Sequence, residues 1–260
     1  MKRLNDLFRK RIGMAEGKNL TMDSLDDLLE RTAWTFPFEN ARILNGTTLP
    51  LTKGNLIKKL LEEKEGGVCY ELNALLYLFL LENGFDAQLV RGEVFVEAKQ
   101  DWTHLGRTHV AIILQQHGES WLVDNGFGGN LPLRPVPLTG KTIRSANGQF
   151  RVKREDSPYG DHLLEMKVKH KQTDWQIGYA FDATRPVTEV AELNEVQEII
   201  QHHEHSPFNK NPLAVKLTPE GSKTLTGTSY TEWIDGKSQK RDIDQTTFQL
   251  LAKEQFGLEF

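Results

Sequence analysis

Apolar residues in the first third of the chain recur at the spacing of amphipathic helices. Leu25, Leu28 and Leu29 fit one helical face, and a second helical segment is expected over residues 56–61. Residues 69–82 form a longer run that is apolar nearly all round, so we expect a buried helix there. The Asn-Gly pair that follows this run is a suitable C-cap and ends the predicted helix.

The hydrophobic period changes to two after residue 87, where residues 88–96 alternate in the manner of a strand. Further strands are predicted at residues 109–114, 121–123, 149–152, 163–168 and 175–181. A polar helix is expected over residues 187–201, followed by a small mixed α/β region. Helices first and strands second indicate an α+β chain with a barrel or curved sheet in the middle. We place the three parts at residues 1–86, 87–186 and 187–260.

The composition limits which cellular compartment and which binding partners are expected. A chain of 260 residues can bury a large core, and its single cysteine excludes an intrachain disulfide, which fits a reducing compartment. The net charge is −4 with both signs mixed, and no long basic run is interleaved with aromatics, so we expect no nucleic-acid partner. Residues 1–11 are basic without a continuous apolar stretch, so neither a signal peptide nor a membrane span is expected. The prediction is a cytoplasmic protein.

The single cysteine, Cys69, stands at the predicted start of the buried helix, after Gly66, Gly67 and Val68. The first turn of a helix presents unpaired N–H groups and the positive end of the macrodipole, which favour a thiolate over a neutral thiol. Glycines before the helix permit sharp or left-handed backbone and leave room for a substrate. The sulfur is therefore a candidate nucleophile. The alternative is a buried packing cysteine, since free cysteine is among the most buried residue types.

A nucleophilic cysteine needs a base and a group that orients the base. His109 begins a predicted strand, and Asp124 follows the strand that returns after residues 115–120. A two-residue turn at His117 and Gly118 places Asp124 diagonally beside His109, and a longer turn over residues 115–118 places them directly opposite. Both registers put the two side chains on one face of the hairpin. The alternative is a polar cross-strand pair on a solvated face.

Two further polar motifs are candidates for ligand binding. Residues 125–130, Asn-Gly-Phe-Gly-Gly-Asn, carry glycines that could present N–H groups to a phosphate or a carbonyl oxygen, although a plain turn explains them equally well. Residues 202–205, His-His-Glu-His, could share a helical face around a metal. Their polar surroundings and the lack of acidic or cysteine partners favour a solvated helix end, so no metal site is predicted.

Three short sequence motifs, and their order along the chain, resemble those of the arylamine N-acetyltransferases. The motifs are Gly66-Gly67-Val68-Cys69-Tyr70-Glu71-Leu72-Asn73, then Thr108-His109-Val110, then Val123-Asp124-Asn125-Gly126-Phe127-Gly128. More of the chain agrees, at Arg11-Ile12-Gly13, Pro37-Phe38-Glu39-Asn40, Ser206-Pro207-Phe208 and Phe256-Gly257-Leu258. The resemblance covers essentially the full length. It implies a helical bundle over 1–86 that carries the nucleophile, a β-barrel over 87–186 and an α/β lid over 187–260, with a papain-like or transglutaminase-like catalytic core.

The resemblance also implies the chemistry. Cys69 would attack the thioester of acetyl-CoA, and an arylamine or hydrazine would then take the acetyl group in a ping-pong cycle, with no metal. Cys69, His109 and Asp124 map onto the family's triad. The substrate-binding residues implied are Phe38, which would line the acceptor pocket, Phe127, and Tyr70, which would contribute backbone donors to the oxyanion. Gly126, Gly128 and Gly129 would lie beside the entering CoA.

One residue departs from the family pattern. The family usually has Arg immediately before the two glycines, whereas this chain has Glu65. A carboxylate near the sulfur would oppose the thiolate by like-charge repulsion unless Lys64 offsets it or the loop is braced differently. Two other functions therefore stay open. The first is a Cys-His-Asp amidase or transglutaminase-like hydrolase, which uses the same triad. The second is a non-catalytic scaffold protein in which Glu65 has abolished the reactivity of the cysteine.

Overall fold

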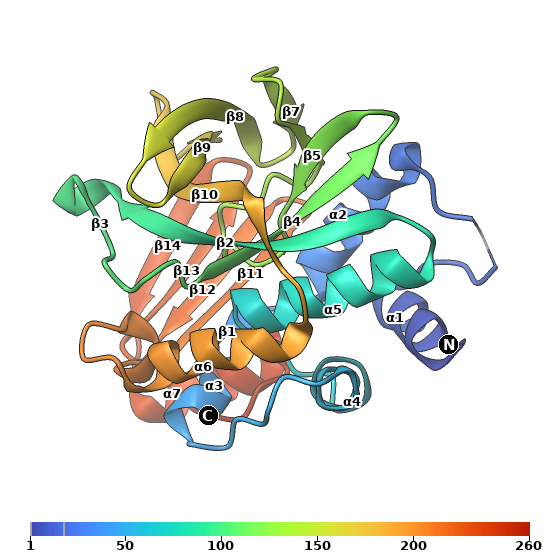
Figure 1. Ribbon diagram of the computed structural model, residues 1–260. Coiled ribbons are helices and arrows are strands. Elements are labelled where there is room, and N and C mark those ends of the chain that lie inside the picture. The colour runs from blue at the N-terminus through green and yellow to red at the C-terminus, as the bar shows by residue number, and fades with distance from the viewer. Residues whose placement is uncertain (1, 18) are drawn as a thin grey trace.

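The computed structural model describes residues 2–17 and 19–260. Helices occupy the first part of the chain, and α5 lies between the long strand β2 and the other N-terminal helices (Figure 1). The α-helices are α1 (Lys2–Ile12), α2 (Leu25–Thr35), α3 (Ala41–Leu44), α4 (Lys53–Leu56), α5 (Cys69–Glu82), α6 (Leu193–His202) and α7 (Gln245–Leu251). Two π-helical segments, Ile57–Glu62 and Ala252–Phe256, extend α4 and α7. Short 3-10 helices span Met22–Ser24, Glu97–Lys99, Val190–Glu192 and Pro207–Asn209.

The helical part packs around α5. Leu4, Phe8 and Ile12 repeat every four residues along α1 and are all buried, which is why a polar N-terminal segment forms a helix here. Phe8 stacks on Phe79 of α5 with ring centroids 4.2 Å apart. Most of α5 is buried on every side, as its apolar sequence predicts.

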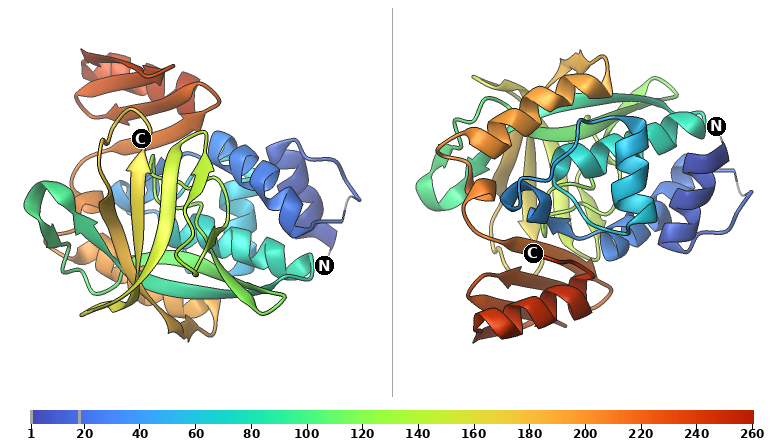
Figure 2. Two further views of the ribbon diagram at one scale, coloured as in Figure 1. Left: turned by 90° about the horizontal axis from the view of Figure 1, so that it is seen from above. Right: turned by 90° about the horizontal axis from the view of Figure 1, so that it is seen from below.

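The middle of the chain forms a nine-stranded antiparallel sheet that nearly closes into a barrel (Figure 2). The strand order is β6-β5-β4-β2-β10-β9-β8-β7, β3 pairs with β2 outside this path, and β6 lies beside β8. Alternate apolar side chains fill its interior, among them Val90, Phe150 and Tyr179. The bounds are β2 (Asp86–Val96), β3 (Asp101–Trp102), β4 (His109–Gln116), β5 (Glu119–Val123), β6 (Val136–Pro137), β7 (Ile143–Ser145), β8 (Gly148–Ser157), β9 (Gly160–Val168) and β10 (Gln176–Val187).

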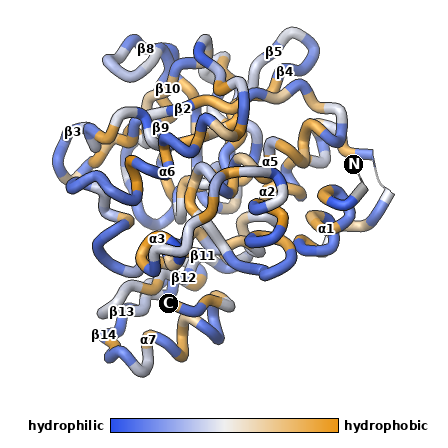
Figure 3. Tube along the Cα trace, turned by 60° about the horizontal axis from the view of Figure 1, so that its bottom comes forward, coloured by the Kyte–Doolittle hydropathy of each residue, from blue (hydrophilic) through white to orange (hydrophobic). Residues whose placement is uncertain are grey.

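A second, five-stranded sheet lies at the C-terminal end and projects to one side (Figure 2). Its strands are β1 (Phe38–Glu39), β11 (Leu213–Thr218), β12 (Gly221–Thr226), β13 (Ser229–Ile234) and β14 (Lys237–Asp242), in the order β1-β11-β12-β13-β14. The helix α7 covers it through Phe248 and Leu251. Hydrophobic and hydrophilic stretches alternate along α1 and α7, as expected of helices with one buried face (Figure 3). Because β1 comes from the N-terminal part, this sheet joins both ends of the chain.

The predicted α+β class with a helical part, a barrel and a mixed C-terminal region is confirmed. The boundaries at residues 86 and 186 stay predictions. The helix α6 packs on the helical part of the chain, because Leu193, Val196 and Ile200 lie in the same apolar cluster as α5. Among the residues described, no helix combines the length and the apolar character that crossing a membrane requires.

Candidate active site

Cys69 is the first residue of α5, as its predicted place at a helix start requires. Val68 is the N-cap residue, and its N–H donates to the Glu71 carboxylate at 3.1 Å, which fixes the first turn. The Cys69 side chain is 7 % exposed, and its Sγ lies 3.5 Å from the Thr108 carbonyl oxygen. The sulfur is therefore held at the positive end of a buried helix, beside the start of β4.

The two glycines before Cys69 are needed for close packing. A Cβ on Gly66 would lie 2.2 Å from the Pro37 carbonyl oxygen, and one on Gly67 would lie 2.8 Å from Glu71 Oε2. Neither glycine has a left-handed φ, so the expected role of unusual backbone conformation is wrong. The backbone of Gly67 instead joins this loop to β1, because its N–H donates to the Pro37 carbonyl at 3.1 Å and its carbonyl accepts the Glu39 N–H at 3.0 Å.

The β4–β5 hairpin turns at His117 and Gly118, whose φ values of 51° and 80° are those of a tight two-residue turn. Gln116 pairs with Glu119 across it. This confirms the first of the two predicted registers, in which the candidate histidine and aspartate lie diagonally on one face.

The Asp124 carboxylate receives four hydrogen bonds in a fully buried position. His109 Nε2 lies 2.7 Å from Oδ2, and the Tyr179 hydroxyl donates to the same oxygen at 2.9 Å. Asn73 Nδ2 and the Gly126 N–H donate to Oδ1 at 2.9 and 2.7 Å. With Nε2 committed to Asp124, Nδ1 is the ring nitrogen left for another partner. The structure thus brings the predicted histidine and aspartate together.

Burial and neighbouring charges shift the pKa values of His109 and Asp124 in opposite directions. Burial alone would lower the pKa of His109, but the Asp124 carboxylate and the hydrogen bond that the imidazolium donates to the Cys69 sulfur raise it to about 10. Burial would raise the pKa of Asp124, yet the imidazolium and the hydrogen bonds from Asn73 and Gly126 hold it below its ordinary value. The geometry therefore favours a charged imidazolium between a carboxylate and the sulfur.

The sulfur opens into an apolar cavity of about 370 Å³. Phe38 and Phe127 line it, as do Gly126, Gly128 and Gly129. Its remaining wall is formed by Cys69, Val94, Val96, Thr103, Leu105, Thr108, His109, Asn130, Ile200, Pro207, Phe208, Leu213 and Val215. The rings of Phe38 and Phe208 meet edge to face at 5.6 Å. The cavity therefore brings residues from all three parts of the chain to the sulfur.

The proposed binding residues differ in their placement. Phe127 packs on the His109 ring with centroids 5.0 Å apart, so it borders the reacting groups. A Cβ on Gly126 would lie 2.6 Å from the Cys69 Cα, so only glycine fits there. The Tyr70 ring is 0 % exposed and points into the helical core, away from the cavity wall. Its backbone N–H lies in the first turn of α5 and stays the proposed oxyanion donor.

Two partners of Asp124 were not predicted as site residues. Asn73 stands four residues after Cys69 on α5, so helical spacing alone could have placed its amide on the same side as the sulfur. Its Nδ2 also donates to the Val110 carbonyl at 2.7 Å, and its Oδ1 accepts from the Asn125 N–H at 2.9 Å. Tyr179 comes from β10, and no local sequence signal points to it.

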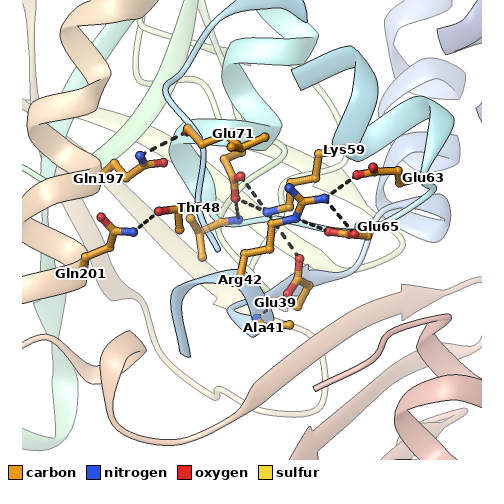
Figure 4. Close-up of polar contacts among 12 residues, drawn as sticks. Glu39, Ala41, Arg42, Thr48, Lys59, Glu63, Glu65, Glu71, Gln197 and Gln201 are labelled. Carbon is orange, nitrogen blue, oxygen red and sulfur yellow. Dashed lines mark hydrogen bonds and ion pairs between the residues drawn. The ribbon is translucent and has the colours of Figure 1, made fainter. Parts of the chain in front are cut away.

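A buried ion-pair network supports the loop before Cys69 (Figure 4). Lys59 Nζ donates to both oxygens of Glu71 at 2.7 and 2.8 Å and lies 3.7 Å from the Glu39 carboxylate. Burial would lower the pKa of Lys59, but these two carboxylates raise it. Glu39 also accepts the Ala41 N–H at 2.6 Å. Lys59 therefore joins the N-terminus of α5 to strand β1 beneath the cavity.

Glu65, the departure from the family pattern, is paired with Arg42. The Arg42 guanidinium donates to both Glu65 oxygens, at 2.7 and 2.9 Å, and also contacts Glu63 (Figure 4). Glu65 lines a separate surface cavity together with Arg42 and the C-terminal Leu258, and it is not in the wall around Cys69. The carboxylate is thus neutralised by a bidentate ion pair, and the loop is braced by Arg42.

The histidine-rich run falls at the end of α6. His202 is exposed and lies 3.5 Å from Glu198 one turn earlier. Within residues 2–17 and 19–260, no group of His, Cys, Asp and Glu side chains has the arrangement of a metal site.

A cysteine at a helix N-terminus, a histidine and a buried aspartate on a barrel define a papain-like cysteine site for acyl transfer. Comparisons agree with this class. A sequence model described as N-acetyltransferase matches residues 21–260. The uncharacterized acetyltransferase YvcN of Bacillus subtilis is 40% identical over 95% of this chain and 94% of its own. Probable arylamine N-acetyltransferase 3 of Dictyostelium discoideum is 34% identical over 91% of this chain and 86% of its own.

A solved arylamine N-acetyltransferase of Bacillus cereus superposes with a TM-score of 0.94 and 38% identity, covering 100% of both chains. The chain belongs to the arylamine N-acetyltransferase family and is an acyltransferase. The Bacillus cereus enzyme is described as having a unique Cys-His-Glu catalytic triad. The third position here is Asp124.

The pairing of Glu65 with Arg42 predicts the effect of a charge swap. Glu65→Arg places two guanidinium groups together, and we expect it to lower the free energy of unfolding by about 1–3 kcal/mol. Arg42→Glu should have a similar cost, and the double variant should recover most of the loss. Urea denaturation of the four proteins gives the coupling energy. Strictly additive losses would contradict the pairing.

The buried position of Lys59 predicts a large loss on neutralisation. Lys59→Met leaves the Glu71 and Glu39 carboxylates without their cation, so we expect unfolding to become easier by about 3–5 kcal/mol. Lys58→Met is the matched control, since Lys58 is exposed and should change stability by less than about 1 kcal/mol. Equal, small losses in both variants would show that Lys59 does not support the loop.

Proposed function

We propose that this acyltransferase carries the acetyl group of acetyl-CoA to arylamines or hydrazines through an acetyl-Cys69 intermediate, in a ping-pong cycle. The observation that carries the proposal is the ion-paired Cys69, His109 and Asp124 at the wall of an apolar cavity. Family membership supports the arylamine acceptor. An arylamine N-acetyltransferase of Mycobacterium marinum, which shares this fold at 24% identity and a TM-score of 0.84, is described in complex with CoA.

In the first half-reaction the Cys69 thiolate attacks the thioester carbonyl, and the His109 imidazolium gives its proton to the departing CoA sulfur. First-turn N–H groups of α5, that of Tyr70 among them, face the developing oxyanion. In the second half-reaction the amine attacks acetyl-Cys69 and its proton passes to His109, which restores the thiolate–imidazolium pair. Asp124 keeps one tautomer and orientation of His109 throughout and does not itself exchange a proton.

Phe38, Phe208 and the aliphatic wall offer an apolar surface to an aromatic acceptor. Gly126, Gly128 and Gly129 leave backbone without side chains in the wall of the same cavity, where the donor would enter. A cytoplasmic location accords with the absence of disulfides and is proposed on that ground. The amidase alternative uses the same triad with water in place of the amine, and the next experiment separates the two.

Acetyl-CoA alone should acetylate the protein. Because the first half-reaction needs no amine, we expect the intact mass to rise by one acetyl group in the wild type and not in Cys69→Ser. Adding an arylamine should reverse the gain and release the N-acetyl product. A wild type that stays unmodified with its thiol free, or one that cleaves amides without CoA, would overturn the transferase proposal.

Removing the negative charge of Asp124 should change the pH dependence of the site. With its pKa at about 10, His109 stays protonated across neutral pH. The imidazolium therefore stabilises the fold fully below about pH 6.5 and loses this effect as the pH rises toward 10. Between about pH 7 and 9 the wild-type His109 imidazole should therefore stay mostly protonated, which the chemical shifts of its ring protons measure.

In Asp124→Asn the pKa of His109 should fall, so that the imidazole loses its proton within this range, and turnover should decrease by about 10³- to 10⁴-fold. Asp174→Asn, at an exposed site, is the control. Thermal unfolding confirms that each variant is folded. A folded Asp124→Asn variant with the wild-type profile would contradict the role of this carboxylate.

A further inference from the structure

Lys171 is a cation without a counter-ion. It lies in the turn after β9, where its N–H donates to the Val168 carbonyl at 3.2 Å. Within the described part of the chain, no hydrogen bond or ion pair engages its ammonium group. The residue is exposed at the surface, yet neighbouring atoms desolvate the ammonium enough to lower its pKa, and no carboxylate offsets this. An anion bound beside the ammonium would compensate for its lost hydration.

The ammonium group stands behind the glycine loop of the catalytic cavity. A Cβ added to Gly129 would lie 3.4 Å from Lys171 Nζ and 3.5 Å from Val215 Cγ1. Both Gly129 and Val215 line the cavity that contains Cys69. Since Gly129 carries no side chain, only its backbone separates the cation from this rim of the cavity.

The loop that separates them is fixed. Asn147 Nδ2 donates to the carbonyl oxygens of Gly129 and Leu131 at 3.1 and 2.9 Å. Lys171 and Asn147 line a second, smaller cavity of about 120 Å³, whose wall also contains Lys169 and the acidic residues Glu220 and Asp235. A ligand that extends from Cys69 past Gly129 therefore meets Lys171 at the near edge of a polar cavity that holds both lysines and carboxylates.

The wall around Cys69 offers no other fixed cation. Of the described residues that line the cavity, His109 alone can carry a positive charge, and its charge is committed to Asp124 and the sulfur. The rest of the wall is mainly aliphatic and aromatic, with Val94, Leu105 and Phe208 among its members. An anionic group on a bound molecule would lose solvation against that wall. The anionic group is better accommodated beside the Lys171 ammonium.

We infer that the Lys171 ammonium binds an anionic group, a phosphate or a carboxylate, of a substrate whose reactive end lies at Cys69. The inference rests on the proposed function for the identity of that reactive end. On the donor the group is a phosphate of CoA, and on the acceptor it is a carboxylate on the aromatic ring. Lys171 thereby places the charged group of the ligand at the Gly129 rim and leaves its apolar parts within the cavity.

The test compares Lys171→Met with Lys141→Met, which removes an exposed charge outside both cavities. Each variant is assayed with acetyl-CoA and with S-acetyl-N-acetylcysteamine, a donor without phosphate. Each is also assayed with 4-aminobenzoate and with the neutral 4-methylaniline. We expect Lys171→Met to raise KM for the charged substrate about three- to tenfold with little change in kcat, and to weaken the salt dependence of that KM.

A rise in KM for acetyl-CoA alone assigns Lys171 to the donor phosphate, and a rise for 4-aminobenzoate alone assigns it to the acceptor carboxylate. Unchanged KM for both charged substrates, or an equal change for their neutral counterparts, overturns the inference. Calorimetric titration of wild type and Lys171→Met with CoA and with 4-aminobenzoate tests binding without turnover. If the wild type forms no acetyl-Cys69, the proposed function fails, and these titrations still decide the role of Lys171.

Discussion

The buried carboxylate of Asp124 is the point on which the arrangement of the site depends. A charged carboxylate without partners is costly in a protein interior, and here four donors from four places in the chain compensate it. They come from α5, β4, the loop after β5 and β10. To satisfy one carboxylate the fold must therefore bring the helical part and the barrel to a fixed separation. That separation places the sulfur beside the imidazole.

The loop before Cys69 is held by a second set of charges that is equally buried. Lys59 bonds Glu71, which caps the first turn of α5, and it also lies near Glu39 of β1. The close approach at Gly66 and Gly67 makes this contact possible, since a side chain at either position would collide with Pro37 or Glu71. Phe38, next to Glu39, lines the cavity. The nucleophile and one wall of the cavity are thus joined by the same ion pairs.

The candidate site residues named from the sequence share a local signal, and most of the partners that only the structure reveals lack one. Cys69 could be placed by the start of an apolar run, and His109 and Asp124 by the parity of one hairpin, because a strand period of two decides which side chains share a face. Asn73 was within reach of helical spacing from Cys69. Tyr179 was not, because β10 meets the site only through its pairing with β2 across the barrel. Arg42 and Glu65 also meet through tertiary folding, so the meaning of Glu65 depends on a partner 23 residues away.

In the proposed cycle, the same cavity would allow an amine to compete with water for the acyl-cysteine. The triad activates any nucleophile that reaches the thioester, so the choice between transfer and hydrolysis depends on what the wall binds. Burying an aromatic ring against Phe38, Phe208 and the aliphatic side chains gains about 1.5–3 kcal/mol, which water cannot match. The bound amine is also held next to the carbonyl, which raises its effective concentration. An uncharged wall therefore contributes to specificity as directly as the triad contributes to reactivity, because it admits a ring and offers few polar partners to water.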